Sequence, residues 1–578
     1  MKRLLLLALP LLFLGAAPGG DSPSRIAADF QQYRMESEPS FRLRRGLRVD
    51  TLSDLTEEGV RKEILVKRSL LDRLARLDSA GLSHEDDLTL QVLRWSLEQD
   101  VRLTDHLGLQ FLVTPHALPL SSTNDVFWRH AFAGREDLDH YLRLLRQYPG
   151  HVRQIQAWTE RQRARGVLVP KETVDQVVPM IRSYIGTGAD SLFTVSPERL
   201  KAIGPKDAEA FSAEVAKLVQ GEVNPSLERL ASYLEGDYRK AAPDRVGLGQ
   251  YPGGPAFYRD LIRYHTGLDL TPEQIHQRGL DEVARIEGQM AEIRRQLGFQ
   301  GTLRQFNDSL RTDPRFLAKT PEEVESRLMA PIRRIEPLIG RYFQRLPKAP
   351  YGVRRLDPSL EGSWTFGFYQ LPTPSEPAGI YLFNGSKLDQ RPLVGAAALI
   401  YHELLPGHHF QLALQRENEA LPELRRELLH TAFVEGWGEY ASELGVEMGL
   451  YDDPYSLYGR LAMDMFLSNR LVVDTGMNAL GWPRSRAVEY MRDHLLESDV
   501  QIDSETLRYA VGMPGQALAY KMGSLKMREL RRRAEQELGP RFDIRRFHEA
   551  LIGSGSLPLG VLEKHIDWWI AREKQADR

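Results

Sequence analysis

Histidines and carboxylates gather in two short segments of this 578-residue sequence, Tyr401-His-Glu-Leu-Leu-Pro-Gly-His-His-Phe-Gln411 and Phe433-Val-Glu-Gly-Trp-Gly-Glu439. A catalytic zinc site commonly takes two neutral imidazoles and one carboxylate. It leaves the fourth position to a water molecule whose pKa the metal lowers. We therefore expect His402, His408 and Glu435 to be the ligands of a Zn²⁺ ion.

The spacing of the two histidines predicts a break in the helix that carries them. His402 and His408 are six residues apart, which in an unbroken helix means a rotation of about 240° and a rise of about 9 Å. Pro406-Gly407 supplies the break, because proline has no N–H and its ring crowds the preceding turn. Leu404-Leu405 would then be looped out. His409 competes with His408 as the second ligand, since seven residues restore the helix face but leave a rise of about 10.5 Å.

Hydrolysis also needs a group that takes the proton of the attacking water. Glu403 follows the first predicted ligand directly and is our candidate general base. The alternative is purely structural, because a single histidine on an apolar helix face is usually a core residue with its hydrogen bonds satisfied. Three histidines and an acid within eight positions, interrupted by Pro-Gly, favour the metal site.

These motifs resemble those of the bacterial DUF885 family, which carries a His-Glu-x-x-Pro-Gly-His-His-x-Gln segment and a downstream Glu-Gly-Trp segment. Further matches are Leu270-Thr-Pro-Glu-Gln-Ile-His276, Pro514-Gly-Gln-Ala-Leu-Ala-Tyr-Lys-Met-Gly523 and Gly555-Ser-Leu-Pro-Leu559. The family in turn resembles zinc metallopeptidases of the thimet-oligopeptidase, angiotensin-converting-enzyme and thermostable-carboxypeptidase type. The resemblance implies that a tyrosine on a late helix, here Tyr520, stabilises the oxyanion; a tyrosine packed in the core is the alternative.

Other polar residues near these motifs have less specific roles. Glu439 and Glu443 lie on the same helix face as Glu435, and such acids usually orient the imidazoles that bind a metal. Glu439 could instead be the metal ligand. Arg508 could bind a substrate carboxylate with two hydrogen bonds, or could simply be solvated.

Composition and the N-terminus indicate an exported protein that does not bind nucleic acid. The net charge is −3, with no basic stripe. Residues 1–20 read as a signal peptide, because Lys2-Arg3 precedes an apolar run that is too short to span a bilayer. The sequence has no cysteine, which excludes disulfides and a lipid-modified cysteine. We expect a periplasmic or secreted protein without stable membrane insertion.

Helical periodicity dominates the rest of the chain, and strand signal is scarce. We expect a mostly α, multi-helix, zincin-like fold with a deep cleft and a small β-sheet beside the metal helix. Residues 379–384 are the best strand candidate, either as an edge strand that pairs with the substrate backbone or as part of a structural hairpin. Residues 362–370 could pair with them. Residues 21–578 are expected to form one helical metallopeptidase-like domain, and a division into two lobes around a cleft stays open.

The function that these features favour is an exported zinc hydrolase acting on short peptides. The same centre could cleave a non-peptide amide or an ester. A non-catalytic peptide-binding protein with a vestigial site is the other alternative, although such a protein would have no use for Glu403. The sequence leaves the oligomeric state open.

Overall fold

The computed structural model describes residues 20–358, 361, 367–373 and 376–575. Residues 1–19 of the predicted signal segment therefore lie outside the described part. Within it the chain is mostly helical, with one three-stranded sheet, as predicted. The α-helices are α1 (Pro23–Ser37), α2 (Pro39–Arg44), α3 (Glu57–Ala75), α4 (His84–Leu103), α5 (Pro119–Trp128), α6 (Arg135–Ala164), α7 (Lys171–Ser183), α8 (Pro205–Leu218), α9 (Asn224–Tyr233), α10 (Arg239–Ala241), α11 (Gly254–Thr266), α12 (Pro272–Gln296), α13 (Leu303–Thr312), α14 (Pro321–Ile335), α15 (Ala396–Glu403), α16 (His408–Glu417), α17 (Glu423–Glu427), α18 (Thr431–Glu447), α19 (Pro454–Asn478), α20 (Arg484–His494), α21 (Asp499–Leu507), α22 (Leu518–Leu538), α23 (Ile544–Ile552) and α24 (Leu559–Gln575).

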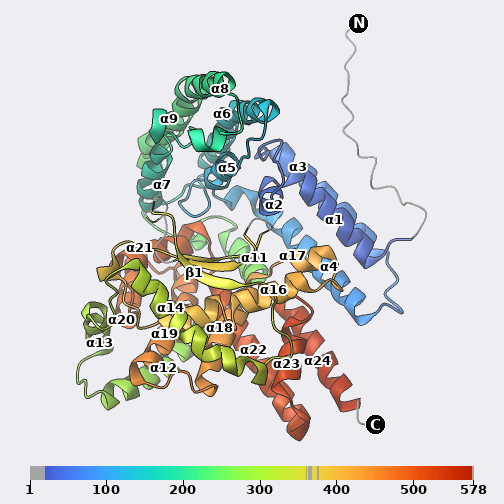
Figure 1. The fold of residues 1–578 in the computed structure, drawn as a ribbon, viewed down its shortest axis with the longest axis vertical. Coiled ribbons are helices and arrows are strands. Elements are labelled where there is room, and N and C mark those ends of the chain that lie inside the picture. Colours follow the sequence, from blue (N-terminus) through green and yellow to red (C-terminus); the bar gives the residue numbers. More distant parts are fainter. Residues whose placement is uncertain (1–19, 359–360, 362–366, 374–375, 576–578) are drawn as a thin grey trace.

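The helices gather into two large groups, with the sheet between them in the view of Figure 1. Helices α5 to α9 form the upper group, and α12, α18, α19 and α22 lie in the lower group below the sheet. In the lower group α12 packs along α19, and α18 packs along both α22 and α15. One apolar core runs from the upper group into α11, α12 and α19, whereas a second fills the space around α14, α15, α18 and α22 to α24.

Local sequence explains where the long helices of the lower group begin. α12 starts after Thr271, whose side chain accepts from the backbone N–H of Gln274 while the Gln274 side chain bonds back, with Pro272 at the first position. α19 starts after Asp453, which accepts from two backbone N–H groups of its first turn.

Two glycines allow α18 and α22 to approach unusually closely. A Cβ on Gly436 would lie 2.5 Å from the Cα of Gly523, and a Cβ on Gly523 would lie 2.0 Å from the carbonyl oxygen of Ala432. Any larger side chain at either position would therefore push the helices apart. This contact brings the start of α22, which carries Tyr520, beside the first turns of α18, which carry Glu435.

The sheet has the order β1-β3-β2, with strands β1 (Tyr351–Arg355), β2 (Gly367–Gln370) and β3 (Gly379–Phe383). β3 runs parallel to β1 and antiparallel to β2, and all five of its residues are buried. Tyr381 and Phe383 join the core around α14 and α15, whereas Ile380 and Leu382 pack on the other face.

The strand predicted at 379–384 is therefore present, and residues 367–370 pair with it as expected. The suggestion that it is an edge strand for substrate pairing is wrong, because both of its sides are already hydrogen-bonded to neighbouring strands. Residues 362–366 of the pairing segment lie outside the described residues.

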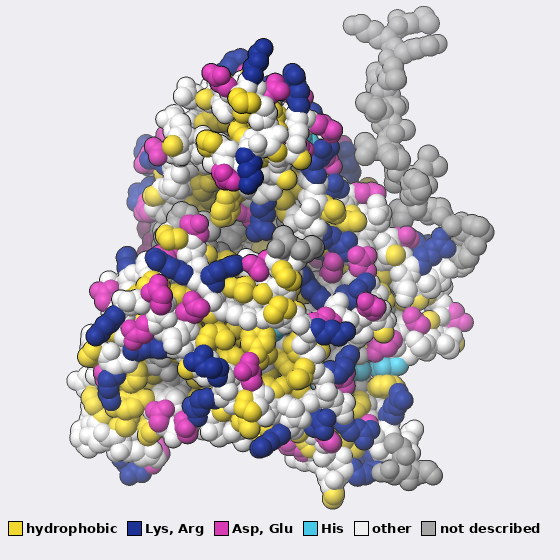
Figure 2. All heavy atoms as spheres, in the orientation of Figure 1, with side chains coloured by type: hydrophobic (Ala, Val, Ile, Leu, Met, Phe, Trp, Pro, Cys, Tyr) yellow, Lys and Arg dark blue, Asp and Glu magenta, His cyan; other side chains and the backbone are white. Residues whose placement is uncertain are grey.

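Other features of the fold bear on the site. No helix among the described residues has the length and apolar character that crossing a membrane requires. Lys and Arg side chains are interspersed with Asp and Glu on the face shown in Figure 2. A cavity of about 510 Å³ lies between α3, α4, α11 and the loop at residues 511–514. The zincin-like topology and the deep cleft stay predictions.

Candidate metal centre

The chain breaks between the two helices that carry the predicted ligands. α15 ends at Glu403 and α16 begins at His408, so the expected interruption around Pro406 is confirmed, with a cis Leu405–Pro406 peptide inside it. Trp437 on α18 holds this turn, because its indole Nε1–H donates to the carbonyl oxygens of Pro406 and Gly407 at 3.0 and 3.2 Å. The break lets His408 turn back towards His402.

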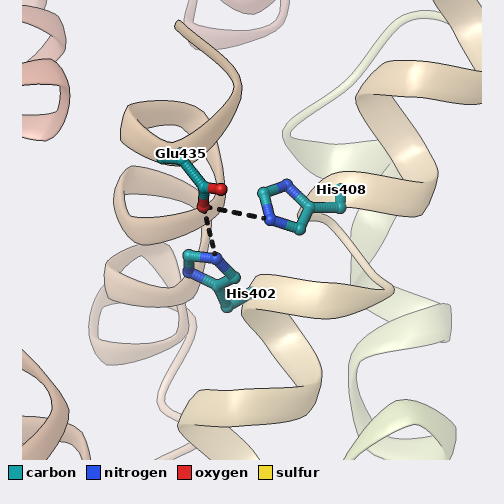
Figure 3. Close-up of side chains that lie close together, drawn as sticks. All are labelled: His402, His408 and Glu435. Atoms are coloured by element: carbon teal, nitrogen blue, oxygen red, sulfur yellow. Dashed lines mark ion pairs between the residues drawn. The ribbon is translucent and has the colours of Figure 1, made fainter. Parts of the chain in front are cut away.

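The side chains of His402, His408 and Glu435 converge from α15, α16 and α18 (Figure 3). The Nε2 atoms of His402 and His408 lie 3.4 and 3.3 Å from the same oxygen, Oε2 of Glu435. Ligand atoms about 2.0–2.2 Å from a tetrahedral Zn²⁺ ion are separated by about 3.3–3.5 Å. One ligand atom from each residue lies within 4.8 Å of the others, so the three groups already have the spacing of a metal site.

His409 points in a different direction, which bears on the choice between the two adjacent histidines. Its Nδ1 is 2.9 Å from the hydroxyl of Tyr369 on β2, and its Nε2 is 3.1 Å from the carbonyl oxygen of Ala349. Both ring nitrogens therefore contact residues in or next to the β-sheet. Only His408 of this pair faces Glu435.

The electrostatics of the cluster suit a cation. Burial disfavours the imidazolium form of His402, but the neighbouring Glu435 and Glu439 outweigh it and raise the pKa of His402 to about 10. Burial also opposes ionisation of Glu435, yet His408 and His402 hold the pKa of its carboxyl well below the usual range. The protein thus stabilises positive charge at this point.

The donor set fits a divalent metal ion with an affinity for nitrogen and oxygen. Two imidazoles and a carboxylate are the ligands that zinc takes in catalytic sites. Within the described residues the buried Nδ1 of His408 and Nδ1 of His402 have no hydrogen-bond partner, although Oε2 of Glu439 lies 3.7 Å from Nδ1 of His402. A carboxylate behind a ligand imidazole fixes the tautomer that leaves Nε2 free to bind metal.

Glu439 is itself held by an arginine that the sequence motifs do not reveal. Its Oε1 pairs with Nη2 of Arg460 on α19 at 2.5 Å, and the two side chains are only 1% and 4% exposed. Removing one member of such a buried pair typically costs about 3–5 kcal/mol. Arg460 therefore anchors the carboxylate behind His402. The available signal was the presence of charged residues inside the largely apolar helix α19.

The charges continue behind Arg460. Asp464, one turn further along α19, pairs with Lys521 on α22, which also lies 2.8 Å from Glu282 on α12. Arg285 of α12 contacts both carboxylates. Lys521 thus faces away from Tyr520, because consecutive residues of a helix point about 100° apart.

The predicted base and oxyanion donor both lie close to the cluster. The side chain of Glu403 is only partly exposed, and the burial of its carboxyl raises the pKa of that group. The positive charges of His408 and His402 offset part of this rise. The pKa of the Tyr520 hydroxyl is raised first by burial and then by the negative charge of Glu435. These interactions place Glu403 and Tyr520 within electrostatic range of the three candidate ligands; their catalytic roles stay predictions.

The fold and this cluster together define a mostly helical protein with a candidate metal centre. The chain belongs to the family described as bacterial protein of unknown function (DUF885), whose model matches residues 39–566. This match confirms the family that the sequence motifs indicated. No curated protein matches the chain.

Two solved structures have the same fold as this chain, and a third resembles it only weakly. A "putative lipoprotein" from Colwellia psychrerythraea is 25% identical, with a TM-score of 0.87, over 95% of this chain and 100% of that chain. A "putative lipoprotein of unknown function" from Shewanella oneidensis is 17% identical, with a TM-score of 0.74, over 94% and 99% of the two chains. A "putative oligoendopeptidase F" from Bacillus anthracis str. Ames has 11% identity, a TM-score of 0.24 and coverage of 90% and 97%, which is too low a score to show a shared fold.

Proposed function

We propose that this protein is an exported zinc-dependent hydrolase that cleaves short peptides. The observation that carries the proposal is the convergence of His402, His408 and Glu435, whose nitrogen and oxygen atoms have the spacing of a tetrahedral zinc site. The position of Glu403 directly after the first of them supports hydrolysis over metal storage, because a storage site needs no base.

Each residue has a distinct task in this mechanism. His402, His408 and Glu435 would hold the ion, which when bound supplies Lewis acidity that brings the pKa of water down to about 7. A carboxylate oxygen of Glu403 would accept the proton of the attacking water and then deliver it to the nitrogen of the leaving amine. The raised pKa of Glu403 favours the first step, since a carboxylate with a higher pKa is a stronger base towards the water proton.

Tyr520 would donate its hydroxyl hydrogen to the oxygen that becomes negative when the carbonyl carbon turns tetrahedral. Its raised pKa keeps the hydroxyl protonated at neutral pH. Glu439 and Arg460 would keep His402 in the orientation that presents Nε2. A peptide as substrate is supported by the resemblance of the motifs to those of zinc metallopeptidases.

The test compares substrates of three classes on the purified chain from residue 21 onwards, loaded with zinc. A peptide library read by mass spectrometry is set beside panels of esters and of acylated amines. We expect turnover of peptides, lost in Glu403→Gln. Turnover confined to esters or acylated amines would mean that the protein is a hydrolase of another class. Binding of peptides without turnover of any panel would refute the proposal that the protein is an enzyme.

A further inference from the structure

Two arginine side chains and one carboxylate form a buried cluster next to Tyr520. Arg470 of α19 donates from Nε to the Tyr509 hydroxyl at 2.8 Å and from Nη2 to Oε2 of Glu505 at 3.1 Å. The Tyr509 hydroxyl also donates to Glu505. The guanidinium of Arg470 lies 4.5 Å from the centre of the Tyr520 ring. The charge of Arg470 is therefore balanced by Glu505.

Arg508, the second arginine, makes only a longer ion pair with the same carboxylate. Its Nη2 is 3.4 Å from the same Glu505 oxygen, and its side chain is 17% exposed. Within the described residues its buried Nε and Nη2 make no hydrogen bond, and the same is true of the buried Oε1 of Gln516 and Nδ1 of His116. A buried charged donor without an acceptor is costly, so Arg508 is a group prepared for an anionic ligand.

Two further carboxyl groups face this region without neutralising Arg508. Asp474 accepts from the Tyr258 hydroxyl at 2.6 Å and from the backbone N–H of Gly515 at 3.0 and 3.1 Å, so its oxygens are occupied. Burial raises the pKa of Asp474 to about 7, and burial together with Glu505 does the same for Glu497. Burial thus weakens the negative charge of both acids, whereas the two arginines share the single carboxylate of Glu505.

Tyr520 lies between this cluster and the candidate metal ligands in its interactions, because it contacts Arg470 and senses the charge of Glu435. Glu435 and Arg508 both act on the pKa of the Tyr520 hydroxyl, so that hydroxyl lies within electrostatic range of both. Residues three to six positions after Arg508 line the cavity of about 510 Å³: Val511, Gly512, Met513 and Pro514. The lining of this cavity is mainly apolar, with Phe257 and Leu261 among its residues.

We propose that Arg508 binds the free C-terminal carboxylate of the peptide substrate, so that the enzyme releases short fragments from C-terminal ends. A guanidinium matches a carboxylate with two parallel hydrogen bonds. This inference rests on the proposed function and names its substrate class. The reaction is ordinary hydrolysis: the C–N bond breaks, the water oxygen bonds to the acyl carbon, and the amine nitrogen takes the proton.

The kinetic test uses one peptide in two forms, with a free C-terminal carboxylate and with a C-terminal amide. The amide removes the negative charge and keeps the length. We expect wild-type kcat/KM to be about 10- to 100-fold higher for the acid, as the loss of a charge-assisted hydrogen bond implies. Arg508→Gln should lose this preference by slowing cleavage of the acid alone. Equal cleavage of acid and amide by the wild-type enzyme would overturn the anchor and leave the peptidase standing.

Arg486→Gln is the matched control. Arg486 is exposed on α20 and stacks on Trp482, with its guanidinium 3.9 Å from the ring centre, so the variant loses the same charge away from the cluster. It should keep the wild-type preference. Arg508→Gln is expected to fold, because it strands no buried partner, and thermal unfolding checks this.

A binding experiment separates recognition of the carboxylate by Arg508 from hydrolysis of the peptide. The acid and amide forms of acetyl-Ala-Ala are titrated calorimetrically into the zinc-loaded wild type and Arg508→Gln. Tighter binding of the acid by tenfold or more, abolished in the variant, supports the anchor even if no peptide is hydrolysed, in which case only the proposed function fails. Equal binding of the two forms would refute it.

Discussion

A methyl group added at Gly438 tests whether the orientation of His402 controls metal affinity. Gly438 lies on α18, and a Cβ there would sit 2.9 Å from Cε1 and Nε2 of His402 and 3.0 Å from its Cδ2. Non-bonded carbon atoms prefer about 3.5–4.0 Å, so the imidazole or the helix must shift by at least about 0.6 Å. Metal–ligand distances tolerate only about ±0.2 Å, and the ring has little room because Glu435 and Glu439 flank it.

We therefore expect Gly438→Ala to fold but to bind zinc about 10- to 100-fold more weakly, the range found when groups that orient a ligand are lost. Affinity is measured by competition with a chromophoric chelator, and folding by circular dichroism and thermal unfolding of the metal-free protein. Gly288→Ala is the control, because Gly288 lies within α12 with no atom within 4 Å of the added Cβ. Its zinc affinity should equal that of the wild type.

A Gly438→Ala variant with wild-type zinc affinity would refute the reasoning. It would mean either that His402 is not a ligand or that α18 yields to the methyl group without moving the ring. A crystal structure of the variant separates these two explanations, since it shows whether the distance between His402 and Glu435 has changed.

Three further outcomes follow from the site. Chelation should abolish hydrolysis and added zinc should restore it, since no other group in the cluster generates a nucleophile at neutral pH; activity in metal-free protein would contradict this. Glu403→Gln should keep its zinc and lose about 10²- to 10⁴-fold in kcat, and wild-type turnover would remove Glu403 from the mechanism. His408→Ala should lower zinc occupancy far more than His409→Ala, because His409 bonds to Tyr369 and Ala349; metal analysis of both variants decides this, and the reverse order would make His409 the ligand.

The helix break could be predicted from the sequence alone, because it depends only on neighbouring residues. A six-residue separation cannot place two histidines on one helix face, and proline cannot continue the hydrogen-bond ladder. The interruption between Glu403 and His408 follows from these two facts. The start of α12 after Thr271 was readable for the same reason, because capping involves residues only three positions apart.

The role of the strand at 379–384 could not be read in this way. Its apolar residues predict a strand, but an edge strand and a central strand differ only in their neighbours. β1 lies well before it in the sequence and joins it in parallel, a pairing for which the local pattern holds no signal. The edge role was one of two alternatives, suggested by the resemblance to metallopeptidases, and the pairing of β3 with both β1 and β2 excludes it.

The sequence by itself thus determined the types of the candidate metal ligands, the broken helix between the two histidines and the helical class, because each depends mainly on residues that are near one another in the chain. Only the tertiary structure decided that His408 turns towards Glu435, that Arg460 supports Glu439, and that Nε and Nη2 of Arg508 find no hydrogen-bond acceptor among the described residues. Such contacts are set by how α12, α18, α19 and α22 pack. A charged side chain in a buried helix must meet a partner, but which partner it meets depends on the packing of distant segments.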